Sequence, residues 1–193
     1  MTTSYRPFLT VVSGIPRSGT SLMMSMLDAG GIPVLVDNVR EADVDNPRGY
    51  YEYEPVKALK RDVAWVALSS GKAVKMVYLL VYDLPPDMEY RILFMHRNID
   101  EVLASQRVML ERLGKPTRVD DGKMARLFEN HLVKFAAWVK DRPNIRVLDV
   151  DYNKMVADPD PFAAEINQFL GGGLDTAAMA ATVDPSLYRN RVT

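Results

Sequence analysis

The feature that most constrains this chain is a glycine-containing loop, Ser13-Gly14-Ile15-Pro16-Arg17-Ser18-Gly19-Thr20-Ser21. It follows the apolar, β-branched run Phe8–Ser13, which predicts a buried strand, and it precedes a predicted helix over Thr20–Ala29. The two glycines have the spacing of a phosphate-binding loop, G-x-x-x-x-G-x-[ST], in the strand-then-helix context that such a loop needs. Backbone N–H groups at a helix N-terminus favour an anion there. We therefore expect a phosphate group to be held by Gly14, Arg17, Ser18, Gly19, Thr20 and Ser21.

The cation of this loop is unusual in its position. In nucleotide triphosphatases a Lys follows the second glycine and reaches the terminal phosphates, whereas this chain has Thr20 there. Arg17 supplies the positive charge instead, and its guanidinium fork can hold two anionic oxygens. The alternative interpretation is a glycine-containing turn with a surface arginine.

Strand-like and helix-like segments alternate along the chain. Apolar runs predict strands over Phe8–Ser13, Ile32–Val36, Ala73–Leu80, Arg91–His96 and Ile145–Val150. Helices are expected over Thr20–Ala29, Pro55–Ser69, Asn98–Leu113, Asp121–Lys140 and Pro161–Leu170, with Asn98 as an N-cap and with Asp100 and Glu101 in the first turn that follows it. This alternation predicts an α/β protein: a three-layer, P-loop-type fold with a central, mainly parallel sheet flanked by helices. Ligands of such folds bind beyond the carboxyl ends of the strands.

Composition limits the other possibilities. The chain has 193 residues, which at about 150 residues per domain favours a single domain over 1–193. A net charge of −1 gives no broad basic surface for nucleic acid. The absence of cysteine excludes disulfides and thiolate sites, and two His make a zinc site unexpected. No apolar run is long enough for a membrane span and the first residues do not look like a signal peptide, so we expect a cytoplasmic protein.

A second anion motif follows the fourth predicted strand. Arg97 ends that strand and Ser105 comes eight residues later in the next helix. A guanidinium and a hydroxyl together suit a phosphate monoester, although an arginine before a helix with a buried serine is also a common structural pattern.

These residues resemble a known family. The stretch Pro16–Ser21 is similar to the 5′-phosphosulfate loop of sulfotransferases that use 3′-phosphoadenosine-5′-phosphosulfate (PAPS), in the arginine form of the tyrosylprotein sulfotransferases and many bacterial relatives. The Arg97–Ser105 spacing resembles the family's 3′-phosphate motif. Asp151-Tyr152, followed by Asp158-Pro159 and Phe169-Leu170-Gly171, resembles a third stretch, in which the tyrosine lies near the adenine.

The resemblance implies an enzyme that takes PAPS as donor, releases adenosine 3′,5′-bisphosphate (PAP) and needs no metal. Its acceptor would be a small molecule or an exposed group that bears a hydroxyl or an amine. Acceptor identity and oligomeric state are not readable from the sequence. Two rival interpretations remain open: a phosphotransferase or nucleotide hydrolase that uses the same loop, and a catalytically silent nucleotide-binding protein.

The chain departs from the family at the catalytic base. Lys75 is retained, but Val77 stands where the cytosolic branch has its histidine. In tyrosylprotein and heparan-type sulfotransferases a glutamate serves, and the candidates here are Glu41, Glu52 and Glu54, of which we prefer Glu52. Each could equally be an exposed loop carboxylate. Near the end of the chain, Arg189 could close over the nucleotide or belong to a solvated basic tail.

Overall fold

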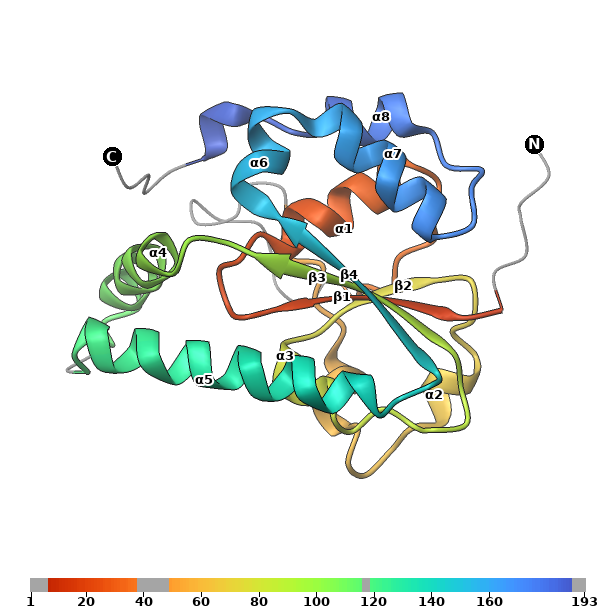
Figure 1. Ribbon diagram of the computed structural model, residues 1–193, viewed down its shortest axis with the longest axis horizontal. Helices are drawn as coiled ribbons and strands as arrows, with labels where there is room; N and C mark the ends of the chain where they lie inside the picture. Colours follow the sequence, from red (N-terminus) through yellow and green to blue (C-terminus); the bar gives the residue numbers. More distant parts are fainter. Residues whose placement is uncertain (1–6, 38–48, 116–118, 189–193) are drawn as a thin grey trace.

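A computed structural model describes residues 7–37, 49–115 and 119–188. Its centre is a four-stranded, fully parallel sheet in the order β2-β1-β3-β4 (Figure 1). The strands are β1 (Leu9–Gly14), β2 (Ala73–Lys75), β3 (Tyr90–His96) and β4 (Ile145–Asp151). The predicted α/β fold with a parallel central sheet is therefore confirmed.

Helices cover both faces of the sheet (Figure 1). One layer contains α1 (Thr20–Ala29), α6 (Tyr152–Ala157), α7 (Pro159–Phe169) and α8 (Thr176–Ala181). The other contains η1 (Glu54–Ala58), α2 (Ala64–Ala67), α3 (Tyr78–Val81), α4 (Ile99–Arg112) and α5 (Asp121–Lys140). A short 3₁₀ turn, η2 (Pro185–Leu187), follows α8.

Alternation along the central strands builds two hydrophobic cores. Ile92 and Phe94 of β3 pack into the core beneath α4 and α5, whereas Leu93 and Met95 point into the core beneath α1 and α7. All four side chains are at most 1% exposed. Apolar side chains on both faces are what a parallel sheet between two helix layers requires.

Three of the predicted elements are wrong. The segment 55–69 is not one helix, because η1 ends at Ala58 and the chain restarts at α2, where the Asp62 carboxylate accepts a hydrogen bond from the Ala64 amide at 2.9 Å. Such a local bond competes with a continuous helix. The run 32–36 makes one isolated bridge, Val34 to Ala73, rather than a strand, and Pro33 has no N–H to donate.

The strand predicted over 73–80 is only three residues long, since its end turns into α3. The short helix α6 was not predicted; it begins where the Asp151 carboxylate accepts from the Lys154 amide at 3.0 Å. The predicted cap at Asn98 is confirmed, because its side chain accepts from the Asp100 amide at 2.9 Å.

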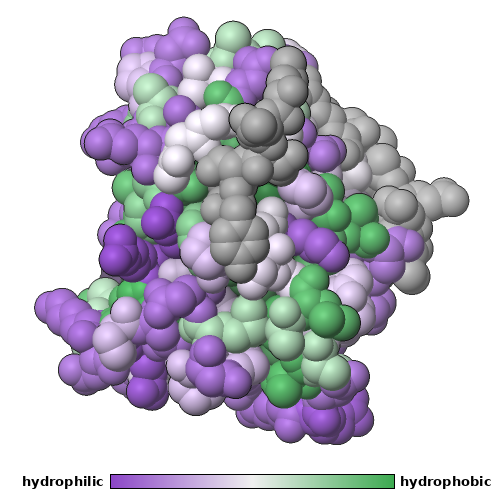
Figure 2. Space-filling view, turned by 90° about the vertical axis from the view of Figure 1, so that its right-hand side faces the viewer, coloured by the Kyte–Doolittle hydropathy of each residue, from purple (hydrophilic) through white to green (hydrophobic). Residues whose placement is uncertain are grey.

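The surface seen from the right-hand side of Figure 1 is mainly hydrophilic, with hydrophobic residues in smaller groups (Figure 2). Within the described ranges, no helix combines the length and the apolar character that crossing a membrane requires.

Candidate functional site

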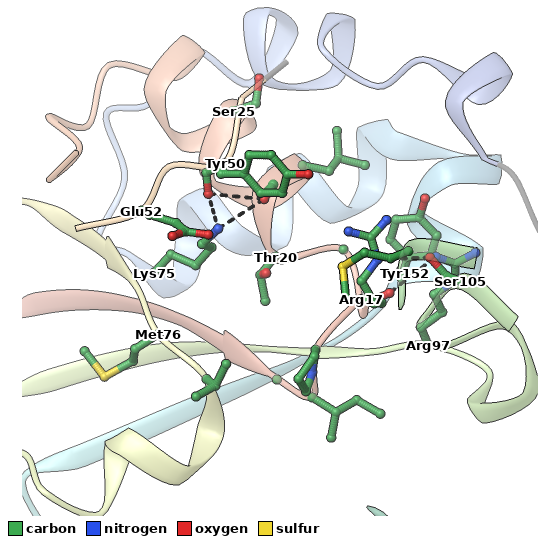
Figure 3. A pocket seen from close by; sticks show the side chains of 18 of the residues that line it. Arg17, Thr20, Ser25, Tyr50, Glu52, Lys75, Met76, Arg97, Ser105 and Tyr152 are labelled. Atoms are coloured by element: carbon green, nitrogen blue, oxygen red, sulfur yellow. Dashed lines mark hydrogen bonds between the residues drawn. The ribbon is translucent and has the colours of Figure 1, made fainter. Parts of the chain in front are cut away.

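A cavity of about 700 Å³ opens at the carboxyl ends of all four strands (Figure 3). Residues at or just beyond the end of each strand line the cavity. They are residues 14–17 at the end of β1, residues 75–77 at the end of β2, Arg97 after β3 and Tyr152 after β4. This is the edge at which parallel α/β sheets bind ligands. The glycine-containing loop and the predicted Arg97 and Ser105 pair therefore face the same space.

The backbone of the phosphate-binding loop requires a glycine at position 19. Gly19 has φ +99°, and a Cβ placed on it would lie 2.2 Å from Cδ2 of Tyr152. The tyrosine ring thus packs directly on the loop backbone, at the residue immediately before α1. Arg17 also has a positive φ, 72°, which costs energy for a residue with a side chain and is a feature often found at functional sites.

The loop can accommodate an anion. Thr20 and Ser21 line the cavity at the N-terminus of the ten-residue helix α1, whose backbone dipole favours negative charge. Ser18 is fully buried behind the loop, and its Oγ has no hydrogen-bond partner among the described residues. Ser18 is not among the residues that line the cavity, and its Oγ lies 2.5 Å from where a Cβ on Gly14 would stand, so the structure does not place this predicted side chain against a ligand.

The two predicted phosphate motifs meet at Arg17. Its Nε donates a hydrogen bond to Oγ of Ser105 on α4 at 3.0 Å, and Nη1 of Arg97 donates to the Arg17 carbonyl oxygen at 3.3 Å. Figure 3 shows the three residues and Tyr152 grouped at one end of the cavity. Two guanidinium groups and a hydroxyl therefore lie in one place, and these are donor types that hydrogen-bond phosphate oxygens.

Arg97 itself is buried, with 8% of its side chain exposed. Its Nε donates to Oε2 of Glu101 at 3.0 Å, and its guanidinium lies 4.8 Å from the centre of the Tyr152 ring. Tyr152 therefore lines the cavity, and its ring packs against Arg97, the arginine of the second anion motif. Sequence reasoning treated Glu101 only as a first-turn acid, and the structure instead buries it beside Arg97.

Lys75 occupies the other end of the cavity. Its Nζ donates to Oγ of Ser21 at 3.3 Å and to the carbonyl oxygen of Tyr50, and the Ser21 hydroxyl also donates to that carbonyl at 3.4 Å (Figure 3). A second cation therefore lies at the N-terminal turn of α1, on the opposite side of the loop from Arg97.

The candidate bases differ in where they lie. The Glu52 side chain lines the cavity and is 27% exposed, with its Oε2 4.0 Å from Lys57 Nζ. Glu54 is 47% exposed, pairs with Lys57 and is not among the described residues that line the cavity. Glu41 and Arg189 lie outside the described residues.

The remaining wall of the cavity is largely apolar. It is formed by one face of α4, by the segment from β2 into α3 and by the region of η1, and its members include Val108, Met109, Met76, Val77, Leu80 and Val56. The polar side chains of Arg112, Lys57 and Asp184 also contribute. In the described part of the chain, no three His, Asp or Glu side chains are grouped to hold a metal ion.

Comparisons with known proteins bear on this site. A model described as the sulfotransferase family matches residues 84–175, just under half of the chain. No curated protein sequence matches the chain significantly.

Several solved structures share the fold. Mouse sulfotransferase SULT7A1 complexed with PAP has a TM-score of 0.55 at 17% identity, over 94% of this chain and 65% of that one. The sulfotransferase domain from the curacin biosynthetic pathway has a TM-score of 0.55 at 15% identity, over 95% of this chain and 90% of the domain. Retinol dehydratase in a complex with retinol and PAP has a TM-score of 0.50 at 15% identity, over 97% of this chain and 71% of that one. The chain spans just under two thirds of the mouse enzyme, and its resemblance to the sulfotransferases is confirmed.

Proposed function

We propose that this chain, which resembles the sulfotransferases and has their fold, transfers a sulfuryl group from PAPS to a hydroxyl or amine of an acceptor. One observation carries the proposal: the Arg17–Ser105 hydrogen bond of 3.0 Å joins the phosphate loop to the second anion motif within a single cavity. A donor with a 5′-phosphosulfate and a 3′-phosphate needs two anion sites at once. Two of the similar structures contain PAP, the product that such a donor leaves.

The residues divide into two anion-binding groups. Thr20 and Ser21, at the N-terminus of α1, and Lys75 would hold the 5′-phosphosulfate. Arg97 and Ser105 would hold the 3′-phosphate, with Tyr152 beside them toward the adenosine. Binding at both ends fixes the donor, and a fixed donor can be attacked in line.

Glu52 is the base that we propose for the acceptor. Its carboxylate would take the proton from the acceptor hydroxyl or amine while that oxygen or nitrogen forms a bond to sulfur. The bond between sulfur and the 5′-phosphate oxygen breaks, and PAP leaves with the electron pair. Arg17 and Lys75 would stabilise the negative charge that develops on the leaving phosphate, a kind of electrostatic stabilisation that is often the largest catalytic contribution.

The cavity can also hold an acceptor. Its volume of about 700 Å³ lies within the usual range for small-molecule sites. Apolar residues of α4 and α3 form part of its wall. A small molecule with an apolar body is therefore the acceptor type that we propose.

Thermal unfolding with three ligands tests the proposal. PAP, adenosine 5′-monophosphate (AMP) and Mg-ATP are added separately, each at a concentration that would exceed its dissociation constant. A ligand at 100 times that constant stabilises a protein by about 2.7 kcal/mol, which shifts the midpoint by several degrees. We expect the largest shift of the midpoint with PAP, and we expect that shift to be independent of Mg²⁺. In a second experiment, an acceptor screen with labelled PAPS should then show transfer of the labelled sulfuryl group. A shift with Mg-ATP alone would instead support phosphoryl transfer.

A further inference from the structure

Glu101 is a buried carboxylate to which the proposed mechanism gives no role. It lies in the first turn of α4 and is 2% exposed. Its Oε2 accepts from Nε of Arg97 and from Nδ2 of Asn153, both at 3.0 Å, and its Oε1 accepts from the Tyr188 hydroxyl at 2.6 Å. A buried charge is tolerated only with a counter-charge and several hydrogen bonds, and Glu101 has both.

Tyr188 brings the C-terminal segment of the described chain to this carboxylate. It follows η2 and is 87 residues from Glu101 in the sequence. Burial and the hydrogen bond to the Glu101 carboxylate raise the pKa of Tyr188, so the phenol keeps the proton that it donates. Asn153 also donates to the Tyr188 hydroxyl, and its own Oδ1 accepts from the Asn98 amide at 3.2 Å. The C-terminal segment is thereby connected to the start of both α6 and α4.

The rings of Tyr152 and Tyr188 both pack against the Arg97 guanidinium. Their centroids are 5.7 Å apart with ring planes at 87°, and the guanidinium carbon lies 4.8 Å from the Tyr152 ring and 5.5 Å from the Tyr188 ring. A cation over aromatic faces at these distances is attracted to both. Arg97 is therefore held by ring contacts in addition to its bond with Glu101.

This arrangement fixes which edge of Arg97 faces the cavity. Glu101 holds the Nε edge, and Nη1 is directed to the Arg17 carbonyl oxygen, on the side where Ser105 also lies. An arginine binds a phosphate well only when its planar donor fork is aligned with the phosphate oxygens. Without the Tyr188 bond, Glu101 loses a hydrogen-bond donor at Oε1, and Arg97 loses part of what holds its orientation.

We propose that Tyr188, acting through Glu101, is a positioning residue that orients Arg97 for the 3′-phosphate, so that the C-terminal segment contributes to the preference for PAP over AMP. The inference rests on the proposed function, since it concerns the same nucleotide site. It predicts an effect on the ligand that carries the 3′-phosphate and none on the ligand that lacks it.

Tyr188→Phe tests this, because it removes the hydroxyl and keeps the ring. Calorimetric titration gives the dissociation constants of PAP and AMP for the wild type and the variant. Since a hydrogen bond to a charged group contributes more than a neutral one, we expect PAP to bind roughly three- to tenfold more weakly. AMP binding stays within about twofold, and with PAPS as substrate KM rises while kcat is maintained. The matched control is Tyr90→Phe, which removes another buried hydroxyl, bonded to the Pro85 carbonyl at 2.9 Å, and should leave the PAP-to-AMP ratio unchanged.

A double-mutant comparison identifies the route of the effect. In an Arg97→Ala background, Tyr188→Phe should weaken PAP binding no further, because the residue through which it acts is gone. The inference is overturned if Tyr188→Phe leaves the PAP-to-AMP ratio at the wild-type value, weakens both ligands equally, or retains its full effect without Arg97. Failure of the proposed function looks different: the wild type itself then binds PAP no more tightly than AMP.

Discussion

Arg17 and Ser105 are 88 residues apart in the sequence and are joined by a hydrogen bond of 3.0 Å between Nε and Oγ. Arg17 stands in the loop after β1 with φ 72°, and Ser105 is a buried residue of α4. The bond crosses the cavity end where Arg97 also lies. Under the proposed function, Arg17 would therefore contribute to the second anion site as well as to the first.

Ser105→Ala should therefore weaken the binding of PAP specifically. The variant removes one hydroxyl next to two guanidinium groups, and the loss of such a charge-assisted bond corresponds to about 1.5 to 3 kcal/mol. We expect a matching decrease in PAP affinity and little change for AMP, both measured by calorimetric titration. Ser69→Ala is the control, because Ser69 is also buried and its hydroxyl donates to the Trp65 carbonyl at 2.6 Å, away from the cavity. Equal losses for PAP and AMP would contradict a 3′-phosphate role.

Glu52→Gln should reduce turnover without reducing donor affinity. The amide retains the size of the side chain but cannot accept the acceptor's proton, and general-base catalysis contributes about 10²- to 10⁴-fold. We expect kcat to decrease by that order while PAP binding is unchanged. Glu54→Gln is the matched control, since Glu54 is 47% exposed and pairs with Lys57. If Glu54→Gln lost turnover and Glu52→Gln did not, the assignment of the base would be reversed.

Local sequence signals predicted those elements whose ends are set by local chemistry. The helix over Thr20–Ala29 was predicted with both of its ends, because glycines flank it, and so was the helix over Asp121–Lys140, whose N-cap Asp120 accepts from the Lys123 amide at 3.0 Å. The segment 55–69 failed because its apolar residues fit a helix pattern, while the Asp62 turn that interrupts it depends on one side-chain bond. The three-residue strand β2 is set by pairing with β1, a contact distant in the sequence.

The candidate site shows the same division. The spacing within the loop and between Arg97 and Ser105 was visible in the sequence, and the structure brings both motifs to one cavity. Glu101, Asn153 and Tyr188 were missed because nothing local distinguishes a first-turn acid that is solvated from one that is buried. Their grouping depends on α4, α6 and the residue after η2 meeting in space.

Gly19→Ala should destabilise the fold more than Gly31→Ala, although the two glycines have similar backbone conformations. Gly19 and Gly31 have φ values of +99° and +92°, so alanine is strained at both, at about 1 to 2 kcal/mol each. Only at Gly19 would the new Cβ also meet the Tyr152 ring, at 2.2 Å, whereas at Gly31 nothing lies within 4 Å. Chemical denaturation should give a loss of about 3 kcal/mol or more for Gly19→Ala. Equal losses for the two variants would show that the tyrosine moves aside at little cost.

Alkaline pH should destabilise the protein through Tyr90. This side chain is 1% exposed, and burial raises the pKa of Tyr90 well above its ordinary value. In the unfolded chain the phenol loses its proton near pH 10, while in the fold it retains it, so the contribution is complete below pH 10 and is lost as the pH rises above that value. For one such group the loss is about 1.4 kcal/mol by pH 11.

Urea unfolding at pH 9, 10 and 11 measures this loss. Tyr90→Phe should start from a lower stability, because the hydrogen bond to the Pro85 carbonyl is gone, but its stability should decline less steeply with pH than that of the wild type. Tyr78, Tyr82 and Tyr188, whose pKa values burial also raises, account for a remaining slope in the variant. Parallel declines for wild type and variant would mean that Tyr90 ionises in the folded protein as readily as in the unfolded chain, against its burial.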